Sequence, residues 1–173
     1  MSKTYRIIVA THKQFQMPED KDLYIPIQVG SEGKEDLGYQ PDNQGVHISH
    51  LNPYYCELTG LYWAWKNLEC DYLGLVHYRR YFTSKRHSYR EAISMDDIIL
   101  SKSEVKNLLS KYDVVVPKKR KYYIETLYSH YAHTHDANHL DVTRQIVSEL
   151  RPDYIDAFDQ VMKQRSGYMF NMF

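Results

Sequence analysis

The stretch 71–82, with the sequence DYLGLVHYRRYF, decides the fold. Its apolar half is short and bounded by polar residues, which is typical of a buried strand in a parallel sheet. One imidazole, one phenol and two guanidinium groups follow that strand directly. They belong to His77, Tyr78, Arg79 and Arg80. Ligands of open α/β sheets bind beyond the carboxyl ends of the strands, and guanidinium binds phosphate as a planar fork. The stretch therefore predicts an anionic ligand, best a diphosphate, with a surface ion-pair cluster as the alternative.

The order of the remaining segments predicts an α/β domain. Buried strands are expected at 5–11, 72–78 and 112–117, and helices at 53–68 and from Ser101 onward. Asn52 followed by Pro53 is a helix start, and Ser101 with Glu104 forms a capping box. Alternation of strands and helices favours a mostly parallel sheet with helices packed against it.

The segments around this framework are less regular. Residues 24–29 contain Pro26 and are expected to form an edge strand at best. Residues 30–49 are rich in Gly, Asp, Asn and Pro and are expected to form a long loop that is either functional or mobile. The helix at 53–68 would direct Tyr54, Leu58, Leu61, Trp65 and Leu68 to one buried face. Gly60 within it indicates close packing or a tolerated weak position.

Length and composition indicate one domain over residues 1–173. A nucleotide-binding half would occupy about 1–120, and a helical segment about 121–173. Lys+Arg and Asp+Glu are both 22, which argues against nucleic-acid binding because that draws on a basic surplus. Two cysteines make neither a disulfide framework nor a zinc site, and no signal peptide or transmembrane segment is recognisable. The cytoplasm is the expected location.

The strand ends supply the first candidate site. Thr11, His12 and Lys13 follow the first strand, and they would meet His77, Arg79 and Arg80 if the two strands are neighbours. Glu57 lies on a largely apolar, aromatic helix, where a carboxylate is costly unless it is paired or functional. It would bind a sugar hydroxyl or an arginine, or it would be a structural ion pair.

Two further clusters allow several interpretations. The run Pro117–Lys121 is interpreted as a solvated basic loop, with contact to phosphates or anionic lipid as the alternative. Four histidines lie between 130 and 139. Of these, His135 and His139 are four residues apart, as two metal ligands on one helix face would be. A single functional His135 on the apolar helix face is the preferred interpretation.

The blocks ISHLNPYYCELTGLYWAWKN at 48–67 and DYLGLVHYRRYF at 71–82 resemble the domain-of-unknown-function 4422 family of bacterial capsular and exopolysaccharide synthesis proteins. IIVATHK at the start and GYMFNMF at 167–173 extend the resemblance over nearly the whole chain. It implies a GT-A-like, Rossmann-like glycosyltransferase that uses a nucleotide diphosphate sugar. Members usually continue past the NMF motif, so a truncated form, without the family's C-terminal portion, is expected.

The resemblance also maps positions of this chain onto the family's motifs, and the chemistry of the residues suggests their roles. Glu57, His77, Arg79 and Arg80 are expected to be catalytic. The substrate-binding positions would be Thr11, His12, Lys13, Tyr62, Trp63, Lys66, Asn67, Tyr78, His135 and Asn171. HYRR stands where most GT-A enzymes have a DxD metal motif, so arginines would neutralise the leaving diphosphate. No metal ligand is assigned, and Mn²⁺ or Mg²⁺ as companion of a UDP-sugar is left open.

The expected partners are a UDP-sugar and a glycan or lipid-linked acceptor. Peripheral association with the inner face of the cell membrane and a homo-oligomer are both left open. The alternative function is a non-catalytic, truncated module that binds nucleotide or glycan or assists a full-length transferase.

Overall fold

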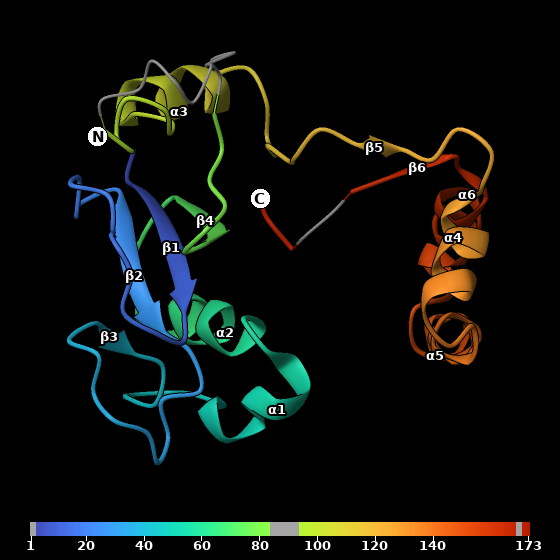
Figure 1. Ribbon diagram of the computed structural model, residues 1–173, viewed down its shortest axis with the longest axis horizontal. Helices are drawn as coiled ribbons and strands as arrows, with labels where there is room; N and C mark the ends of the chain where they lie inside the picture. The colour runs from blue at the N-terminus through green and yellow to red at the C-terminus, as the bar shows by residue number, and fades with distance from the viewer. Residues whose placement is uncertain (1–2, 84–93, 169–170) are drawn as a thin grey trace. The chain divides into compact units, whose positions relative to one another are not determined.

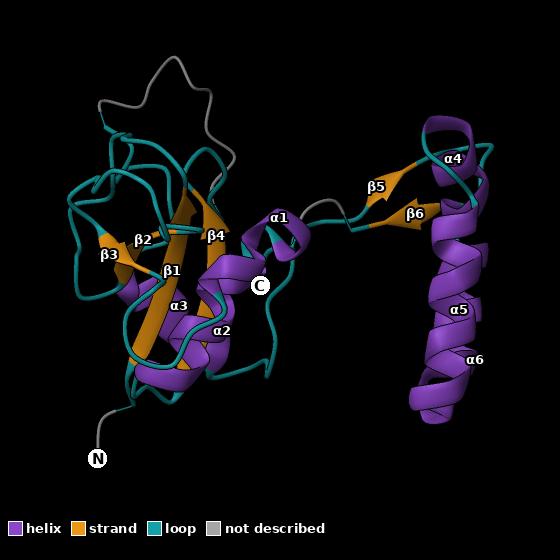
Figure 2. Ribbon diagram, turned by 90° about the horizontal axis from the view of Figure 1, so that it is seen from below, coloured by secondary structure: helices purple, strands orange, loops and turns teal. Residues whose placement is uncertain are grey.

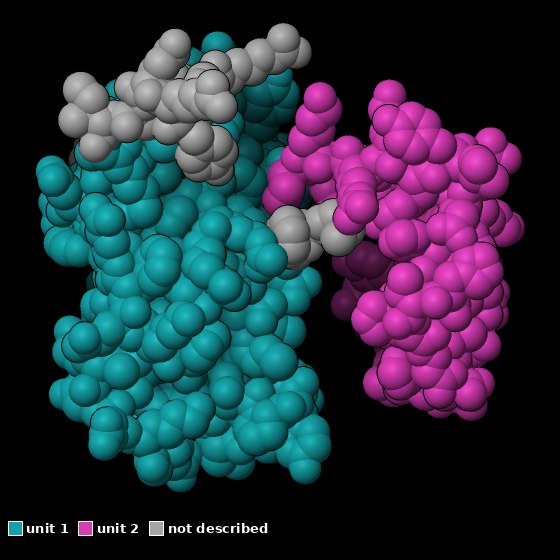
Figure 3. All heavy atoms as spheres, in the orientation of Figure 1, with its two compact units in different colours: residues 1–116, 171–173 teal, residues 117–170 magenta. Residues whose placement is uncertain are grey.

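The computed structural model describes residues 3–83, 94–168 and 171–173. Within them the chain divides into two compact units, shown in different colours in Figure 3. Unit 1 comprises residues 1–116 with 171–173, and unit 2 comprises residues 117–170. The division falls near the boundary expected at about residue 120, and the expectation of a single domain over 1–173 stays a prediction.

Unit 1 is built on a four-stranded parallel sheet with the order β3-β2-β1-β4 (Figure 1). The strands are β1 (Tyr5–Thr11), β2 (Tyr24–Gln28), β3 (Gln40–Pro41) and β4 (Tyr72–His77). The strands predicted at 5–11 and 72–78 are therefore confirmed, and the fold class is α/β. β2 is not an edge strand, because β3 pairs with Ile27 and Gln28. Pro26 is tolerated there because the short β3 does not reach it.

In the described part of unit 1, four helical segments accompany this sheet. They are the 3₁₀ helix η1 (Ser49–Leu51), α1 (Asn52–Tyr55), α2 (Leu58–Asn67) and α3 (Lys102–Leu109). Successive residues of a strand point to opposite faces, and β1 accordingly contributes to two core clusters. Ile7 and Val9 belong to the cluster that contains Val105 of α3, and Ile8 belongs to the cluster that contains Trp63 of α2. Figure 2 shows these helices around the strands.

The helix predicted at 53–68 is broken into α1 and α2. Cys56 has a φ of 49°, a left-handed conformation that ends α1, and Glu57 then precedes α2. Asn52 is the first residue of α1 and does not act as its N-cap. Its side-chain amide instead donates to the carbonyl of Cys56 (2.7 Å) and so holds the break.

The break also changes which face of the helix is buried. Tyr54 and Trp65, predicted to face the core, are exposed, at 83% for Tyr54. α2 instead buries Thr59, Gly60, Trp63 and Ala64. A Cβ on Gly60 would lie 2.7 Å from Val29 Cγ1, so this glycine marks close packing.

The prediction of a third strand at 112–117 is wrong. Residues 113–117 form no strand, and Val114 is 66% exposed. The free edge of β4 is used differently: Leu75 N donates to Phe173 O (2.8 Å), and Phe173 N donates to Leu75 O (3.3 Å). Phe173, and not the apolar run 113–117, thus pairs with Leu75 at this edge. The high β propensity of that run is not sufficient to make it a strand. The capping box of α3 at Ser101 and Glu104 is confirmed.

Unit 2 is mainly helical, as predicted. It contains α4 (Leu127–Thr134), α5 (Asn138–Leu150), η2 (Pro152–Tyr154) and α6 (Ile155–Lys163). A short antiparallel pair, β5 (Arg120–Lys121) and β6 (Ser166–Gly167), brings its two ends together. Part of the run predicted as a basic loop is thus β5. Within the described residues, no helix is long and apolar enough to cross a membrane.

Candidate functional site

The carboxyl ends of β1 and β4 lie side by side at one edge of the sheet. The register pairs Ala10 with His77, and Tyr78 N donates to Ala10 O (3.2 Å). The condition for a shared site, that these two strands are neighbours, is therefore met. The segments 11–13 and 77–80 leave the sheet together, at the edge where α/β folds bind ligands.

The first group of predicted residues surrounds the ring of Tyr78, which is buried. His12 and Phe15 meet the ring edge-on, with centroids 5.4 Å and 5.2 Å away. Lys13 Nζ lies 5.6 Å and Arg79 Cζ 5.0 Å from the ring centroid. His12, Lys13 and Arg79 are exposed. A buried phenol ring thus positions two permanent cations at the surface through cation–π contacts.

Thr11 shapes the turn that carries these side chains. It is buried, its hydroxyl donates to Lys13 O (2.6 Å), and its carbonyl accepts from Val29 N (2.9 Å). The hydroxyl is engaged within the turn. Thr11 therefore positions Lys13, and its role as a substrate-binding residue stays a prediction.

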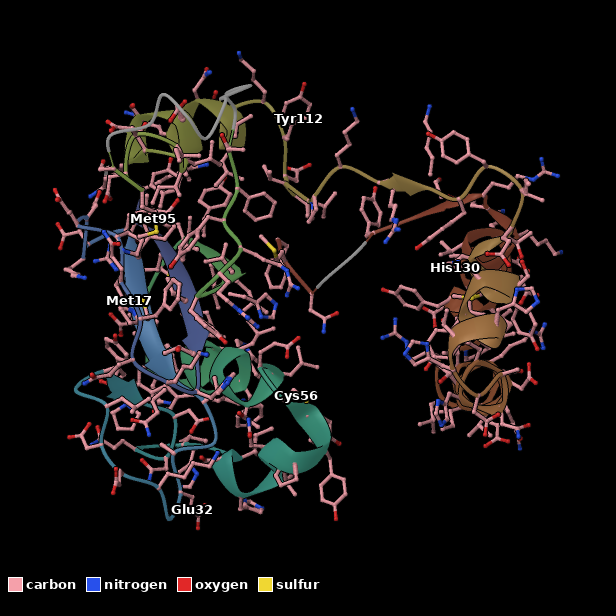
Figure 4. The ribbon with its side chains drawn as sticks, in the orientation of Figure 1. Met17, Glu32, Cys56, Met95, Tyr112 and His130 are labelled. Atoms are coloured by element: carbon pink, nitrogen blue, oxygen red, sulfur yellow. The ribbon has the colours of Figure 1, made fainter. Side chains whose placement is uncertain are left out.

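The second group is formed by Glu57, His77 and Asn171. Asn171 Nδ2 donates to Glu57 Oε1 (2.7 Å), and His77 Nε2 lies 3.9 Å from the same oxygen. The side chains of Glu57 and His77 are each 18% exposed. In Figure 4 the label on Cys56 marks the α1–α2 break that directly precedes Glu57. The chain changes direction at this break. The carboxylate of Glu57, at the start of α2, therefore lies close to His77 at the end of β4.

His77 has an unusual environment. Burial lowers its pKa below the ordinary value, as does Arg80 to a smaller extent, while Glu57 acts in the opposite direction. Nε2 is buried and has no hydrogen-bond partner among the residues that the structure describes. Arg80 turns back on His77, because Arg80 N donates to His77 O (2.8 Å) and His77 N to Arg80 O (3.2 Å). A neutral imidazole with an unpaired buried nitrogen is suited to bind a hydroxyl.

The sequence profile of the domain-of-unknown-function 4422 family (DUF4422) matches residues 6–173. The chain belongs to the DUF4422 family. Among solved structures it is similar to the apo form of WbbM, a bifunctional glycosyltransferase, with a TM-score of 0.82 and 29% identity. The match covers 98% of this chain and 33% of the WbbM chain, so the DUF4422 chain spans a third of that protein. It has no match among curated proteins.

Two residues predicted to bind substrate, Trp63 and Asn67, also hold a loop, and their role toward substrate stays a prediction. Trp63 Nε1 donates to Gln44 O (2.8 Å), and Asn67 bonds both the amide and the carbonyl of Val46. Trp63 is buried against the sheet. Both side chains are thus occupied in fixing residues 44–46 on α2, where they have a structural role.

Tyr62 and Lys66 form a separate surface group on α2. The rings of Tyr62 and Trp65 meet edge-on with centroids 5.8 Å apart, and Lys66 Nζ lies 3.5 Å from the centroid of Trp65. Surface aromatic rings beside a cation can bind sugar or base faces. Their role as substrate-binding residues stays a prediction.

His135 lies in unit 2 and is the C-cap of α4, with its ring stacked on Tyr131 (4.7 Å). It is exposed, so the inward orientation predicted for it is wrong. His139 belongs to α5, because the chain leaves the helix at 135. The two histidines therefore do not share one helix face as a metal pair.

Sequence reasoning overlooked two contributors to this region. Phe15 packs on Tyr78, and an aromatic residue shortly after a strand end is a signal that could have indicated it. Asp42 is fully buried and anchors the loop between β2 and η1. An aspartate in a segment rich in Gly, Asp and Asn carries no pattern that separates it from its exposed neighbours.

Proposed function

We propose that this chain is a glycosyltransferase domain that moves a sugar from a nucleotide diphosphate sugar to a hydroxyl of a glycan or lipid-linked acceptor. The pair Glu57–His77 carries the proposal. It is a largely buried carboxylate and a buried imidazole nitrogen, 3.9 Å apart, at the carboxyl end of β4. The exposed cations Lys13 and Arg79 follow the ends of the neighbouring strands β1 and β4. The likeness to a bifunctional glycosyltransferase over 98% of the chain supports it. A GT-A-type site and a role in bacterial surface polysaccharide synthesis belong to the same proposal.

The spacing of the pair suits a hydroxyl group. An oxygen at ~2.8 Å from both His77 Nε2 and Glu57 Oε1 forms a triangle on the 3.9 Å base, with hydrogen bonds of ordinary length. His77 would donate to that oxygen, and Glu57 would accept its proton. Asn171 fixes the carboxylate through its own donor. The group thus resembles a general base with an orienting partner.

The reaction follows from this arrangement. The acceptor oxygen forms a bond to the anomeric carbon of the donor sugar while the bond from that carbon to the diphosphate oxygen breaks. The bonding electrons leave with the diphosphate, and the acceptor proton passes to Glu57. Lys13 and Arg79 would offset the charge that develops on the departing diphosphate, which is where fixed cations lower a barrier. A divalent ion beside the diphosphate, Mn²⁺ or Mg²⁺, would also offset this charge. Nucleotide binding is therefore to be measured with and without Mn²⁺.

Isothermal titration with UDP, GDP and CDP, each with and without Mn²⁺, tests the first half of the proposal. We expect UDP to bind and Arg79→Gln to weaken it about tenfold, since a hydrogen bond to a charged group contributes ~1.5–3 kcal/mol. Arg151→Gln is the matched control, because Arg151 is an exposed arginine paired with Asp153 in unit 2. Failure of all three nucleotides to bind would contradict the proposal.

Sugar transfer from UDP-sugars, measured by UDP release with and without acceptor glycans, tests the second half. Glu57→Gln should abolish transfer and leave UDP binding intact, because the amide keeps the shape but not the basicity. Nucleotide binding without transfer or donor hydrolysis would favour the second candidate, a non-catalytic binding module.

A further inference from the structure

Three side chains with metal-binding groups converge away from the site described above. Glu32 follows β2, and His47 and His50 lie just before and within η1. One ligand atom from each lies within 4.8 Å of the other two, and among the described residues this is the one such group. Figure 4 labels Glu32 on the loop beyond the sheet.

The two segments that carry these side chains are tied to one buried carboxylate. Ser31, next to Glu32, donates to Asp42 through its amide and its hydroxyl (both 3.0 Å). Ser49, next to His50, donates its hydroxyl to the same oxygen (2.5 Å). The backbone positions of Glu32 and His50 are therefore fixed by Asp42, and the ligand set needs little ordering when an ion binds.

We propose that Glu32, His47 and His50 form a binding site for one divalent transition-metal ion of the Zn²⁺ type. Two imidazoles and one carboxylate are a set that Zn²⁺ takes with a further position open to water. Imidazole disfavours Ca²⁺ and Mg²⁺, which prefer oxygen ligands. Bonds of ~2.0–2.1 Å in a tetrahedral site put ligand atoms ~3.3 Å apart, so each side chain closes in by about one ångström.

The side chains have the freedom to make this movement. Glu32 and His50 are exposed, and rotation about their side-chain bonds needs no change in the core. His47 Nδ1 accepts from Ser49 N at 3.4 Å, a length at which a hydrogen bond is weak. Loss of this weak contact costs little, so the imidazole of His47 is free to turn toward an ion. The bound ion would clip the loop after β2 to η1.

Titration of the chain with Co²⁺, a spectroscopic substitute for Zn²⁺, tests the site without any nucleotide. We expect one Co²⁺ per chain, with the strong visible absorption of a four- or five-coordinate ion, displaced by one equivalent of Zn²⁺. Saturating Zn²⁺ should raise the Tm by about 5–11 °C, because an ion at ~100 times its Kd stabilises the folded state by ~2.7 kcal/mol. Saturable binding weaker than millimolar, or an octahedral spectrum, would overturn the proposal.

Variants assign the binding to this loop. The double variant His47→Ala/His50→Ala and the single variant Glu32→Gln should each weaken Co²⁺ binding at least tenfold. Glu32→Gln alters only an exposed side chain, so its result stands even if the double variant folds poorly. The matched control is His135→Ala/His139→Ala in unit 2, which should bind Co²⁺ as the wild type does. Equal loss in control and loop variants, or loss in the control alone, would refute the assignment.

Discussion

Replacement of Asp42 by asparagine should destabilise unit 1 strongly, although Asp42 lies in a loop. Its carboxylate is 0% exposed and accepts five hydrogen bonds. The donors are Gly30 N (2.8 Å), Ser31 N and Oγ (both 3.0 Å), Ser49 Oγ (2.5 Å) and Thr59 Oγ1 (2.6 Å). Burial raises the pKa of Asp42, but these hydrogen bonds outweigh it and hold the pKa below its ordinary value. The group is therefore charged at neutral pH.

The magnitude follows from what an amide can accept. If the asparagine NH₂ takes the place of Oδ2, Thr59 can turn its hydroxyl to the carbonyl of Cys56 (3.0 Å), but Gly30 N loses its acceptor. A buried unpaired amide costs ~1–3 kcal/mol, and hydrogen bonds weaken by ~1 kcal/mol each when the acceptor loses its charge. Relief from burying the charge offsets part of this loss. We expect Asp42→Asn to lower the free energy of unfolding by about 3 kcal/mol, or the Tm by about 6–12 °C.

Urea unfolding followed by tryptophan fluorescence measures this change. Both tryptophans, Trp63 and Trp65, lie on α2 in unit 1, so the signal reports on the affected unit. Asp36→Asn is the matched control, because Asp36 is an exposed loop aspartate that accepts from Gly38 N (2.7 Å), and its change should stay within about 0.5 kcal/mol. An Asp42→Asn protein as stable as the wild type at pH 7 would refute the account of this loop.

The pH dependence gives an independent check on Asp42. Its pKa is depressed in the folded state, so its stabilisation is present above the ordinary aspartate value of ~3.9 and is lost as the pH falls through the lower folded value. Asparagine has no such loss. The stability difference between wild type and Asp42→Asn should therefore shrink below about pH 4. A difference that stays constant down to pH 2 would show that the carboxylate is not held in its charged form.

Three further outcomes are expected. Gly60→Ala should destabilise unit 1 by about 1 kcal/mol, because overpacking against Val29 costs ~1–3 kcal/mol and the gain in helix propensity is only ~1 kcal/mol. Urea unfolding measures this change in stability. A variant more stable than the wild type would contradict the prediction. Burial depresses the pKa of His77 below ~6.5, so the unfolded state binds a proton more readily than the folded state. The wild type should therefore lose stability relative to His77→Gln as the pH falls from about 7 to 5. Curves of unfolding free energy against pH that stay parallel for the two proteins would contradict this prediction. Tyr78→Leu should weaken UDP binding about threefold by releasing Arg79, at ~0.5–1 kcal/mol per exposed cation–π contact, while Tyr78→Phe should bind normally.

The sheet could be predicted where local pattern and tertiary environment agree. The apolar run of β1 is buried on both faces, and β4 buries Leu75 and Val76, which point to opposite faces; burial on both faces is the condition under which such runs form parallel strands. The position of the candidate site followed from them, because neighbouring parallel strands bring their carboxyl ends to one edge. The capping box of α3 is a purely local signal and was equally readable.

The errors have the opposite origin. The break at Cys56 depends on a residue with positive φ that is not a glycine, and the side chain of Asn52, four residues earlier, holds it. Asn52 followed by Pro53 is a usual helix start, so the sequence did not indicate that Asn52 would bond the carbonyl of Cys56 and help to end the helix. The run at 113–117 has the composition of a strand, but Phe173, distant in sequence, pairs with Leu75 at the edge of β4. Both outcomes depend on specific contacts that a residue propensity cannot represent.

Burial also determines which residues point most strongly to function. Exposed arginines such as Arg79 are common on protein surfaces and cost the fold little, so residue type alone could not separate a diphosphate site from a surface charge cluster. His77 is different, because a buried nitrogen without a partner costs ~1–3 kcal/mol that the fold must offset elsewhere. Placing that nitrogen 3.9 Å from the restrained carboxylate of Glu57 makes sense if a ligand hydroxyl completes the group. The functional hypothesis therefore depends more on this buried pair than on the arginines from which the sequence argument began.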